Sequence, residues 1–222
     1  MKKLFGFALA AMVSVSSIFA GALDDMGIYG KLDLGWTTGS VRYDVDGFSG
    51  AEGFSGFELY PALGLEPAAT KFEDKPFDLT FEAAVDMIFG KVDLYDSAKV
   101  TAITPAVTAF FNWHFEDSDS AFLQKFVPYG GVGLAVPIQM VKFSYKSLDA
   151  EATQAAIMKG DFSARIYKDE DYNSTVVGFD LTFLVGARYA LTDKIEVNAE
   201  TGYNCISMNN WFIRGGALYR FK

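Results

Sequence analysis

Apolar and polar residues alternate along most of the chain with a period of two. In the first such segment, Ile28, Leu32 and Leu34 fall on one face, whereas Lys31 and Asp33 fall on the other. Because successive side chains of a β-strand point to opposite faces of the sheet, this alternation predicts strands with one apolar face. Further segments of the same kind lie at 57–66, 77–89, 103–113, 131–138, 177–189, 195–203 and 211–221.

The alternation alone does not say which face lies inside. A soluble barrel or sandwich buries its apolar face, whereas a membrane barrel turns that face to lipid and keeps polar groups in its lumen. Most of the segments reach the ~9–11 residues of a tilted spanning strand, which exceeds the ~5–6 residues of an ordinary soluble strand. Length therefore favours a membrane barrel, with a soluble exported β protein as the alternative.

Large aromatic residues gather at the two ends of the predicted strands. If the first strand runs outward, the ring expected at the outer end consists of Trp36, Phe57, Phe89, Tyr203 and Trp211. The ring expected at the inner end consists of Phe77, Trp113, Phe126, Tyr189 and Phe221. Two such rings are typical of strands that cross a bilayer, because aromatic side chains prefer the membrane–water interfaces.

The expected connections are longer on the outer side. Stretches 37–56 and 140–174 are predicted outer loops, and the shorter connections lie at 67–76, 116–125 and 191–194. Long outer loops with shorter inner turns are the usual asymmetry of membrane barrels. An even strand number permits closure without a free edge. The sequence thus predicts an all-β fold, an eight-stranded antiparallel up-and-down transmembrane β-barrel.

The longest outer stretch contains elements of its own. Alternation at 141–145 and again at 162–166 predicts that these two segments pair as a hairpin, with helix-forming residues at 149–158 between them. Residues 169–171 are three consecutive acids and read as an exposed tip. Three prolines, Pro61, Pro105 and Pro137, fall inside predicted strands. Because proline cannot donate to a ladder, each marks either a bulge or a misplaced strand boundary.

The first residues have the layout of a secretory signal. Lys2 and Lys3 precede an apolar stretch at 4–19, and small residues follow at 20–22. This pattern predicts a signal peptide of residues 1–22, cleaved near Ala22, and a barrel domain of residues 23–222. A membrane-anchoring or amphipathic N-terminal helix is the alternative.

Composition excludes several other classes. The chain is 50% hydrophobic and 16% aromatic, which is unlike a disordered protein. Its 28 acidic against 19 basic residues give a formal net charge of −9, so no nucleic-acid partner is expected. A single Cys and a single His leave almost no ligands for a zinc or iron–sulfur site. We therefore expect no cofactor and no metal.

Three short motifs carry a resemblance. They are Pro-Tyr-Gly-Gly-Val-Gly at 128–133, Val-Gly-Ala-Arg-Tyr-Ala-Leu-Thr-Asp-Lys at 185–194, and Gly-Ala-Leu-Tyr-Arg-Phe at 216–221. With these motifs the sequence resembles the small outer-membrane β-barrel families of diderm bacteria, the group that includes the OmpA transmembrane domain, OmpX and OmpW. The resemblance implies a location in the outer membrane, contact with its lipid, and recognition of the C-terminal strand by the barrel assembly machinery. It implies no particular activity.

The predicted inner face is charged. The expected lumen network comprises Lys31, Asp33, Glu58, Glu82, Asp86, Asp180, Arg188, Glu196, Glu200, Arg214 and Arg220. Buried charges are costly unless they are paired, and an eight-stranded interior is mostly filled by side chains. The leading interpretation is therefore a largely plugged polar lumen with a structural role in the envelope. A narrow porin-like path whose acidic excess favours cations is the second interpretation.

Candidate catalytic groups are scarce. The chain's only His, His114, falls near the inner end of the fourth strand, and Cys205 falls at the end of the seventh. Neither a serine nucleophile motif nor a glycine-rich phosphate loop is visible, so we expect no catalytic residues and no enzyme activity. A surface adhesin or ligand-binding protein that acts through its long outer loops, with an unknown ligand, is the third interpretation.

Overall fold

The computed structural model describes residues 26–45, 48–67, 75–92, 98–115, 118–159, 161 and 163–221. Its strands are β1 (Met26–Val45), β2 (Phe48–Pro67), β3 (Phe77–Val92), β4 (Lys99–Trp113), β5 (Phe126–Ala135), β6 (Ile138–Leu148), β7 (Tyr167–Val177), β8 (Asp180–Ala190), β9 (Ile195–Asn204) and β10 (Asn210–Arg220). The helices are η2 (Leu123–Lys125) and α2 (Ala150–Met158). Among these residues no helix is long and apolar enough to span a bilayer. The predicted signal peptide lies outside the described residues.

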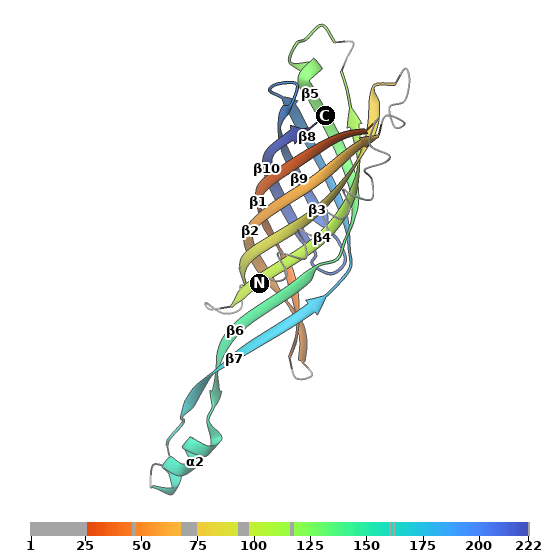
Figure 1. Cartoon of the computed structure of the whole chain (residues 1–222). Coiled ribbons are helices and arrows are strands. Elements are labelled where there is room, and N and C mark those ends of the chain that lie inside the picture. The colour runs from red at the N-terminus through yellow and green to blue at the C-terminus, as the bar shows by residue number, and fades with distance from the viewer. Residues whose placement is uncertain are drawn as a thin grey trace.

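Eight strands close into a barrel (Figure 1). Each of β1, β2, β3, β4, β5, β8, β9 and β10 pairs antiparallel with the next in this order, and β10 pairs back with β1. Closure lets every strand bond to a neighbour on both sides, which removes the open edges of a sheet. The predicted eight-stranded antiparallel barrel is confirmed.

The apolar face of the barrel points outward. Leu32, Trp36 and Val185 are each more than half exposed, at 53%, 53% and 61%. Asp33 and Glu58, on the alternate positions, have no exposed surface at all. This distribution is the reverse of a soluble barrel, whose apolar residues fill the interior. It is the arrangement that a lipid-facing wall requires.

None of the three prolines forms a bulge, and only one of them lies at a strand boundary. Pro61 interrupts the β2–β3 ladder between Leu59 and Ala62, but the register is the same on both sides of the gap. Pro105 lies inside β4, whose pairing passes there from β6 to β5 without a shift. Pro137 alone marks a strand end, in the two-residue break between β5 and β6. Each ring removes one N–H from the ladder, and no residue is inserted to compensate.

Two long ribbons extend the barrel at the end that the sequence predicts to be outer. β1 and β2 remain paired as far as Val45 and Phe48, so the predicted outer loop at 37–56 was wrong. Its Gly and Ser residues do not interrupt the strand, because both chains continue the ladder of the barrel. β6 and β7 form the second ribbon, in the same register as β5 and β8 of the barrel, and α2 joins their far ends (Figure 1). We call β6, α2 and β7 the arm.

The predictions for the arm were partly right. The helix expected at 149–158 is α2, and the Asp149 side chain accepts a hydrogen bond from Ala152 N at its N-terminus. The predicted hairpin partner was wrong, because Val141 pairs with Ser174 in β7 rather than with residues 162–166. The acids at 169–171 lie within β7 and do not form a tip. Alternation located the strands, but it could not choose between two nearby partners.

Candidate functional site

The middle of the lumen holds a buried ion-pair cluster. Lys31 Nζ lies 3.2 Å from Asp33 Oδ2, 3.3 Å from Glu82 Oε1 and 3.3 Å from Glu200 Oε2. Arg214 Nη1 donates to Glu58 Oε1 at 2.7 Å, and Arg214 Nε donates to Glu200. These residues come from β1, β2, β3, β9 and β10, so the cluster ties together opposite parts of the wall. We call these six residues the central cluster: Lys31, Asp33, Glu58, Glu82, Glu200 and Arg214.

Tyrosines complete the central cluster. Tyr29 and Tyr60 donate to the two oxygens of Glu82 at 3.3 and 2.9 Å, and Tyr129 donates to Glu200 at 2.6 Å. The guanidinium of Arg214 also lies 3.4 Å from the centre of the Tyr60 ring. A carboxylate removed from water needs such donors, because each unpaired lone pair would otherwise cost free energy.

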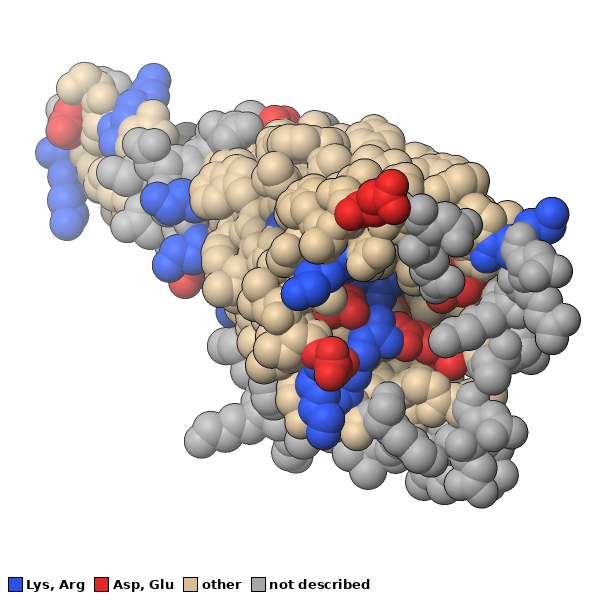
Figure 2. Space-filling view, turned by 90° about the horizontal axis from the view of Figure 1, so that it is seen from above, with Lys and Arg blue, Asp and Glu red and all other residues tan. Residues whose placement is uncertain are grey.

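A second group of charges lies at the inner mouth of the barrel. Arg220 bonds to Glu66 and Glu196, and Arg188 Nη1 lies 3.8 Å from Glu66 Oε1. Arg188 also donates to the amide of Asn112, which in turn donates to Asp78 Oδ1 at 2.6 Å. Figure 2, seen from this end, shows acidic and basic side chains gathered in the opening within a rim of other residues. Arg220 remains 27% exposed, so this group is in contact with solvent.

Two residues of the predicted network lie apart from the ion pairs. Asp180 accepts hydrogen bonds from the backbone N–H groups of residues 206, 207 and 208, so it fixes the connection between β9 and β10. Asp86 is 5% exposed, and its Oδ1 has no hydrogen-bond partner among the described groups. The charges that act on it are those of Glu58 and Arg214. The other nine predicted residues take part in the two groups described above.

The outer part of the lumen is largely apolar, although the buried Gln139 lies beside Ala102 there and its Nε2 has no hydrogen-bond partner among the described groups. Side chains from the barrel and from the first residues of the arm pack there, all less than 9% exposed. We call this set the apolar layer: Val41, Phe54, Ile88, Val92, Ala98, Val100, Ala102, Val141 and Met208. The sequence pattern does not predict this layer, because it predicts a loop at 37–56. Val41 and Phe54 fall on the inward-facing positions of the period-two alternation, and this pattern could have revealed the apolar layer.

A small cavity lies beside the central cluster. The cavity bounded by Tyr29, Lys31 and Glu82 on one side and by Tyr129 and Arg188 on the other has a volume of about 10 Å³. One water molecule requires about 10–15 Å³, so this cavity holds at most a single water.

Inward-facing glycines make room for the large side chains. A Cβ built on Gly64 would lie 1.8 Å from Tyr29 Cζ, so the Tyr29 ring occupies the space that a side chain at position 64 would fill. Similarly, Gly186 faces Tyr129 and Glu200, with a built Cβ at 2.7 Å from each. Tyr29 and Tyr129 therefore depend on glycines in neighbouring strands.

The predicted aromatic residues lie in two groups on the wall of the barrel, but Trp36 and Phe57 fall in the middle of β1 and β2 rather than at a strand end, because both strands continue beyond them as a ribbon. On the outer side, Trp36 stands opposite Phe57, and Phe57 opposite Phe89. Tyr203 and Trp211 form another opposed pair. All five side chains are exposed, between 43% and 53%.

On the inner side, the aromatic residues form pairs that stack on one another. Phe77 lies opposite Trp113 with ring centres 6.3 Å apart, and Phe126 lies opposite Tyr189. Phe122, which the sequence analysis did not include, stacks 5.3 Å from Tyr189 and 5.7 Å from Phe126. Phe77, Phe126 and Tyr189 are consequently half-buried, whereas Trp113 and Phe221 are exposed.

The groups with possible chemistry lie far apart in the fold. His114 Nε2 is 3.0 Å from Asp78 Oδ2 at the inner mouth. Cys205 Sγ contacts the carbonyl of Leu181 at 3.3 Å. Within the described ranges, no group of three or more His, Cys, Asp or Glu residues has a geometry that could hold a metal ion.

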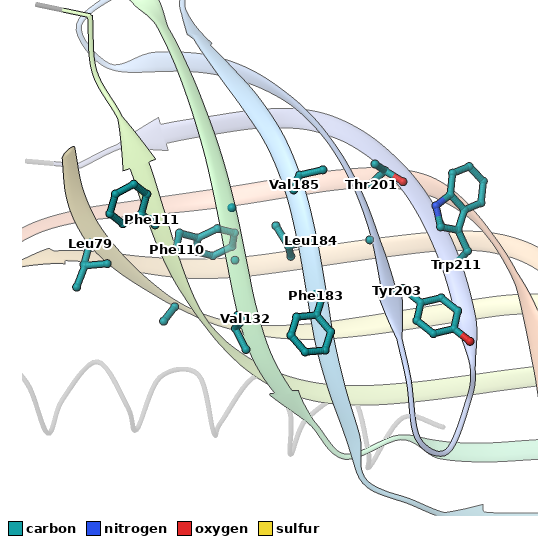
Figure 3. A pocket seen from close by; sticks show the side chains of 14 residues that line it. Leu79, Phe110, Phe111, Val132, Phe183, Leu184, Val185, Thr201, Tyr203 and Trp211 are labelled. Atoms are coloured by element: carbon teal, nitrogen blue, oxygen red, sulfur yellow. The ribbon is translucent and has the colours of Figure 1, made fainter. Parts of the chain in front are cut away.

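A shallow hollow of about 670 Å³ lies in the wall formed by β4, β5, β8 and β9 (Figure 3). Outward side chains such as Phe183, Val185 and Tyr203 border it, and Gly130 lies beneath it. Its lining includes no acidic or basic residue, so it offers van der Waals contacts rather than polar recognition.

Comparison with known proteins gives a family. Residues 5–221 match the family model described as the outer membrane protein beta-barrel domain. No curated protein matches the sequence. Among solved structures, Neisserial surface protein A is 18% identical, with a TM-score of 0.45, over 87% of this chain and 95% of that one.

Two further solved structures are similar at lower identity. Ail, the attachment invasion locus protein of Yersinia pestis, is 14% identical, with a TM-score of 0.42, over 87% of this chain and 98% of that one. The N-terminal β-barrel domain of Pseudomonas aeruginosa OprF is 11% identical, with a TM-score of 0.35, over 88% and 99% of the two chains. The family model covers nearly the whole sequence, and the barrel has the inverted polarity described above. The chain therefore belongs to the outer membrane protein β-barrel domain family, and its location is the outer membrane.

Proposed function

We propose that this protein is a structural component of the outer membrane whose barrel does not conduct. The observation that carries the proposal is the filling of the lumen in two successive layers. The central cluster crosses the barrel with direct ion pairs, and the apolar layer follows it toward the outer end. An ion would have to replace its hydration shell among the fixed charges of the first layer, and the second layer, where Gln139 is the buried polar neighbour of Ala102, offers few groups to do so.

The acidic excess of the central cluster is an argument for the competing function, a narrow cation path. Its four carboxylates face two cations, and the carboxylate of Asp86 lies beside them. Such an excess favours cations only where water can enter. The small cavity volume and the apolar layer both oppose entry, and for this reason we favour the closed barrel.

Conductance in planar bilayers tests the proposal. The wild-type protein is expected to give no discrete openings at any voltage that the bilayer withstands. Insertion is verified by protection of the barrel from added protease. Discrete openings that disappear in Ala102→Phe, which adds a ring to the apolar layer, would contradict the closed lumen. The matched control is Ala109→Phe, because Ala109 carries the same side chain on the outward face.

A second experiment tests the role in the envelope. Cells that lack the gene are expected to become sensitive to detergent, and wild-type protein should restore resistance. Ala102→Phe should restore it equally, because a structural role does not require passage through the lumen. If Ala102→Phe folds but fails to restore resistance, the protein acts through its lumen and the proposal is wrong.

The arm supports a second candidate function, attachment to an external surface. Its two strands extend the barrel wall outward, and Met158, Ile166 and Tyr167 near its end are exposed at 78%, 40% and 57%. Replacing residues 149–166 by Asn-Gly would join β6 to β7 in a short turn. Cells with this variant should attach less to collagen-coated or glass surfaces than cells with the wild-type protein. Unchanged attachment with a folded barrel would reject this function.

A further inference from the structure

Three lysines stand side by side on the outward face of the barrel near its outer end. Lys91 in β3 lies directly opposite Lys99 in β4, and Lys99 lies directly opposite Lys142 in β6. All three side chains are exposed. Directly opposed residues on adjacent strands have Cβ atoms about 4.5–5.5 Å apart, so three positive charges lie within about 10 Å along one row. We call these residues the lysine row.

The lysine row is unfavourable on its own. Like charges directly opposite each other destabilise a pair of strands. No carboxylate stands directly opposite either end of the row, where Ser55 faces Lys91 and Asn173 faces Lys142; Asp171 lies on the same face, two residues beyond Asn173. None of the ion pairs found among the described side chains includes a lysine of the row. The arrangement is therefore suited to an external anion.

The position of the row defines what kind of anion can reach it. Two residues closer to the middle of the barrel on each strand, the outward positions are Phe89, Thr101 and Met140, which form the next row of the wall. Phe89 belongs to the outer aromatic ring and is 49% exposed. The lysines therefore stand immediately beyond the apolar wall, at the level of lipid headgroups. A molecule that places phosphates on the row can lay its acyl chains against that wall.

The row is confined to one side of the barrel. On β9 and β10, the residues between Tyr203 and Trp211 include no charged side chain. A general attraction to an anionic surface would not require three lysines directly opposite one another on adjacent strands. We propose that the face formed by β3, β4 and β6 binds the phosphorylated headgroup of a glycolipid in the outer leaflet, with Lys91, Lys99 and Lys142 as its ligands. The inference rests on the outer-membrane location and is independent of whether the lumen conducts.

Native mass spectrometry of the purified full chain tests this site, with diphosphoryl lipid A as the probe and monophosphoryl lipid A as the comparison lipid. One lysine at a membrane surface contributes about fivefold to binding an anionic lipid. The triple variant K91Q/K99Q/K142Q should therefore bind diphosphoryl lipid A about 100-fold more weakly. The wild-type protein should prefer the diphosphoryl form, and the variant should lose this preference.

The matched control removes three other exposed lysines. K125Q/K159Q/K194Q changes the net charge equally, but these positions lie in η2, at the end of α2 and in the turn between β8 and β9. The control should bind within twofold of the wild-type protein. Equal weakening in both triple variants would reduce the effect to net charge and overturn the site, and so would wild-type binding by K91Q/K99Q/K142Q.

Stability supplies a second readout that does not depend on measured affinity. Lys99→Gln removes the middle charge of the row, so it should raise the unfolding temperature in zwitterionic micelles. In micelles that contain diphosphoryl lipid A the same substitution should lower it, because a ligand of the phosphate is lost. A decrease in both media would mean that the row is neutralised within the chain, and this outcome would overturn the proposal. Failure of any of these tests leaves the conductance prediction for the lumen unaffected.

Discussion

The lumen contains two layers that exclude water by different means. The central cluster fills its space with charges that lie within 4.0 Å of opposite charges, although neither oxygen of Asp33 accepts a hydrogen bond from the described groups. The apolar layer fills its space with aliphatic and aromatic side chains, of which Ile88 and Val41 have no exposed surface. In the first layer, removing one partner leaves another charge buried without compensation. In the second, removing a methyl group costs only the lost contacts and the small cavity left behind. A single substitution in the central cluster should therefore reduce stability far more than one in the apolar layer.

Arg214→Met is expected to have the largest effect. Arg214 bonds to Glu58 and Glu200 and stacks on Tyr60. Its loss leaves two buried carboxylates short of a partner, at a cost of about 3–5 kcal/mol. Urea unfolding in lipid vesicles, followed by tryptophan fluorescence, measures this cost. Arg165→Met on the exposed arm is the control and should change stability by less than about 0.5 kcal/mol. A loss below about 1 kcal/mol for Arg214→Met would show that the cluster tolerates an unpaired charge.

Removing the partner of Arg214 should recover part of that loss. Glu58→Gln deletes one of the carboxylates that Arg214→Met leaves unpaired, so the double variant should be more stable than the sum of the single effects. A coupling of about 0.5–3 kcal/mol is expected for residues in one network. The same cycle with Thr153→Ala in α2 should give additive effects within about 0.5 kcal/mol. Additivity at Glu58 as well would mean that the two residues do not act as a pair.

Gly64→Ala tests the packing around the central cluster. The added methyl group would displace the Tyr29 ring, whose hydroxyl donates to Glu82. Overpacking of this kind costs about 1–3 kcal/mol. Gly130→Ala is the matched control, because its built Cβ meets only the carbonyl oxygen of Leu184, at 3.8 Å, on the outward face. Equal effects at both positions would show that the Tyr29 ring can move without cost.

Ile88→Val should have the smallest effect of the series. It removes one methylene from the apolar layer, which costs about 0.5–1.5 kcal/mol. Ile213→Val is the matched control, since Ile213 is 51% exposed on the outward wall and lipid can fill the space. If Ile88→Val destabilises the barrel as much as Arg214→Met, the contrast between the two layers is incorrect.

Much of the barrel could be predicted because the alternation of apolar and polar residues can be recognised in each segment by itself. The parity of Lys31, Asp33 and Arg214 placed them on the inner face from the sequence alone. Parity cannot say which charges meet, and so Glu66 was left out of the network although it bonds to Arg220. Asp180 was included although it accepts backbone N–H groups instead. Such partners depend on the stagger of the strands, which no single segment contains.

The sequence by itself determined the eight segments that form the barrel wall, the apolar face of each and the even number that permits closure, but not the extension of β1 and β2 or the strand β7. These properties follow from alternation and from the need to satisfy every backbone group in lipid. The tertiary structure alone decided how the lumen is filled. Gly64 accommodates Tyr29, and Ile88 meets side chains from other strands and from the arm, only after the barrel closes. The lysine row likewise exists only in the folded barrel, because register aligns residues 91, 99 and 142 that are distant in sequence.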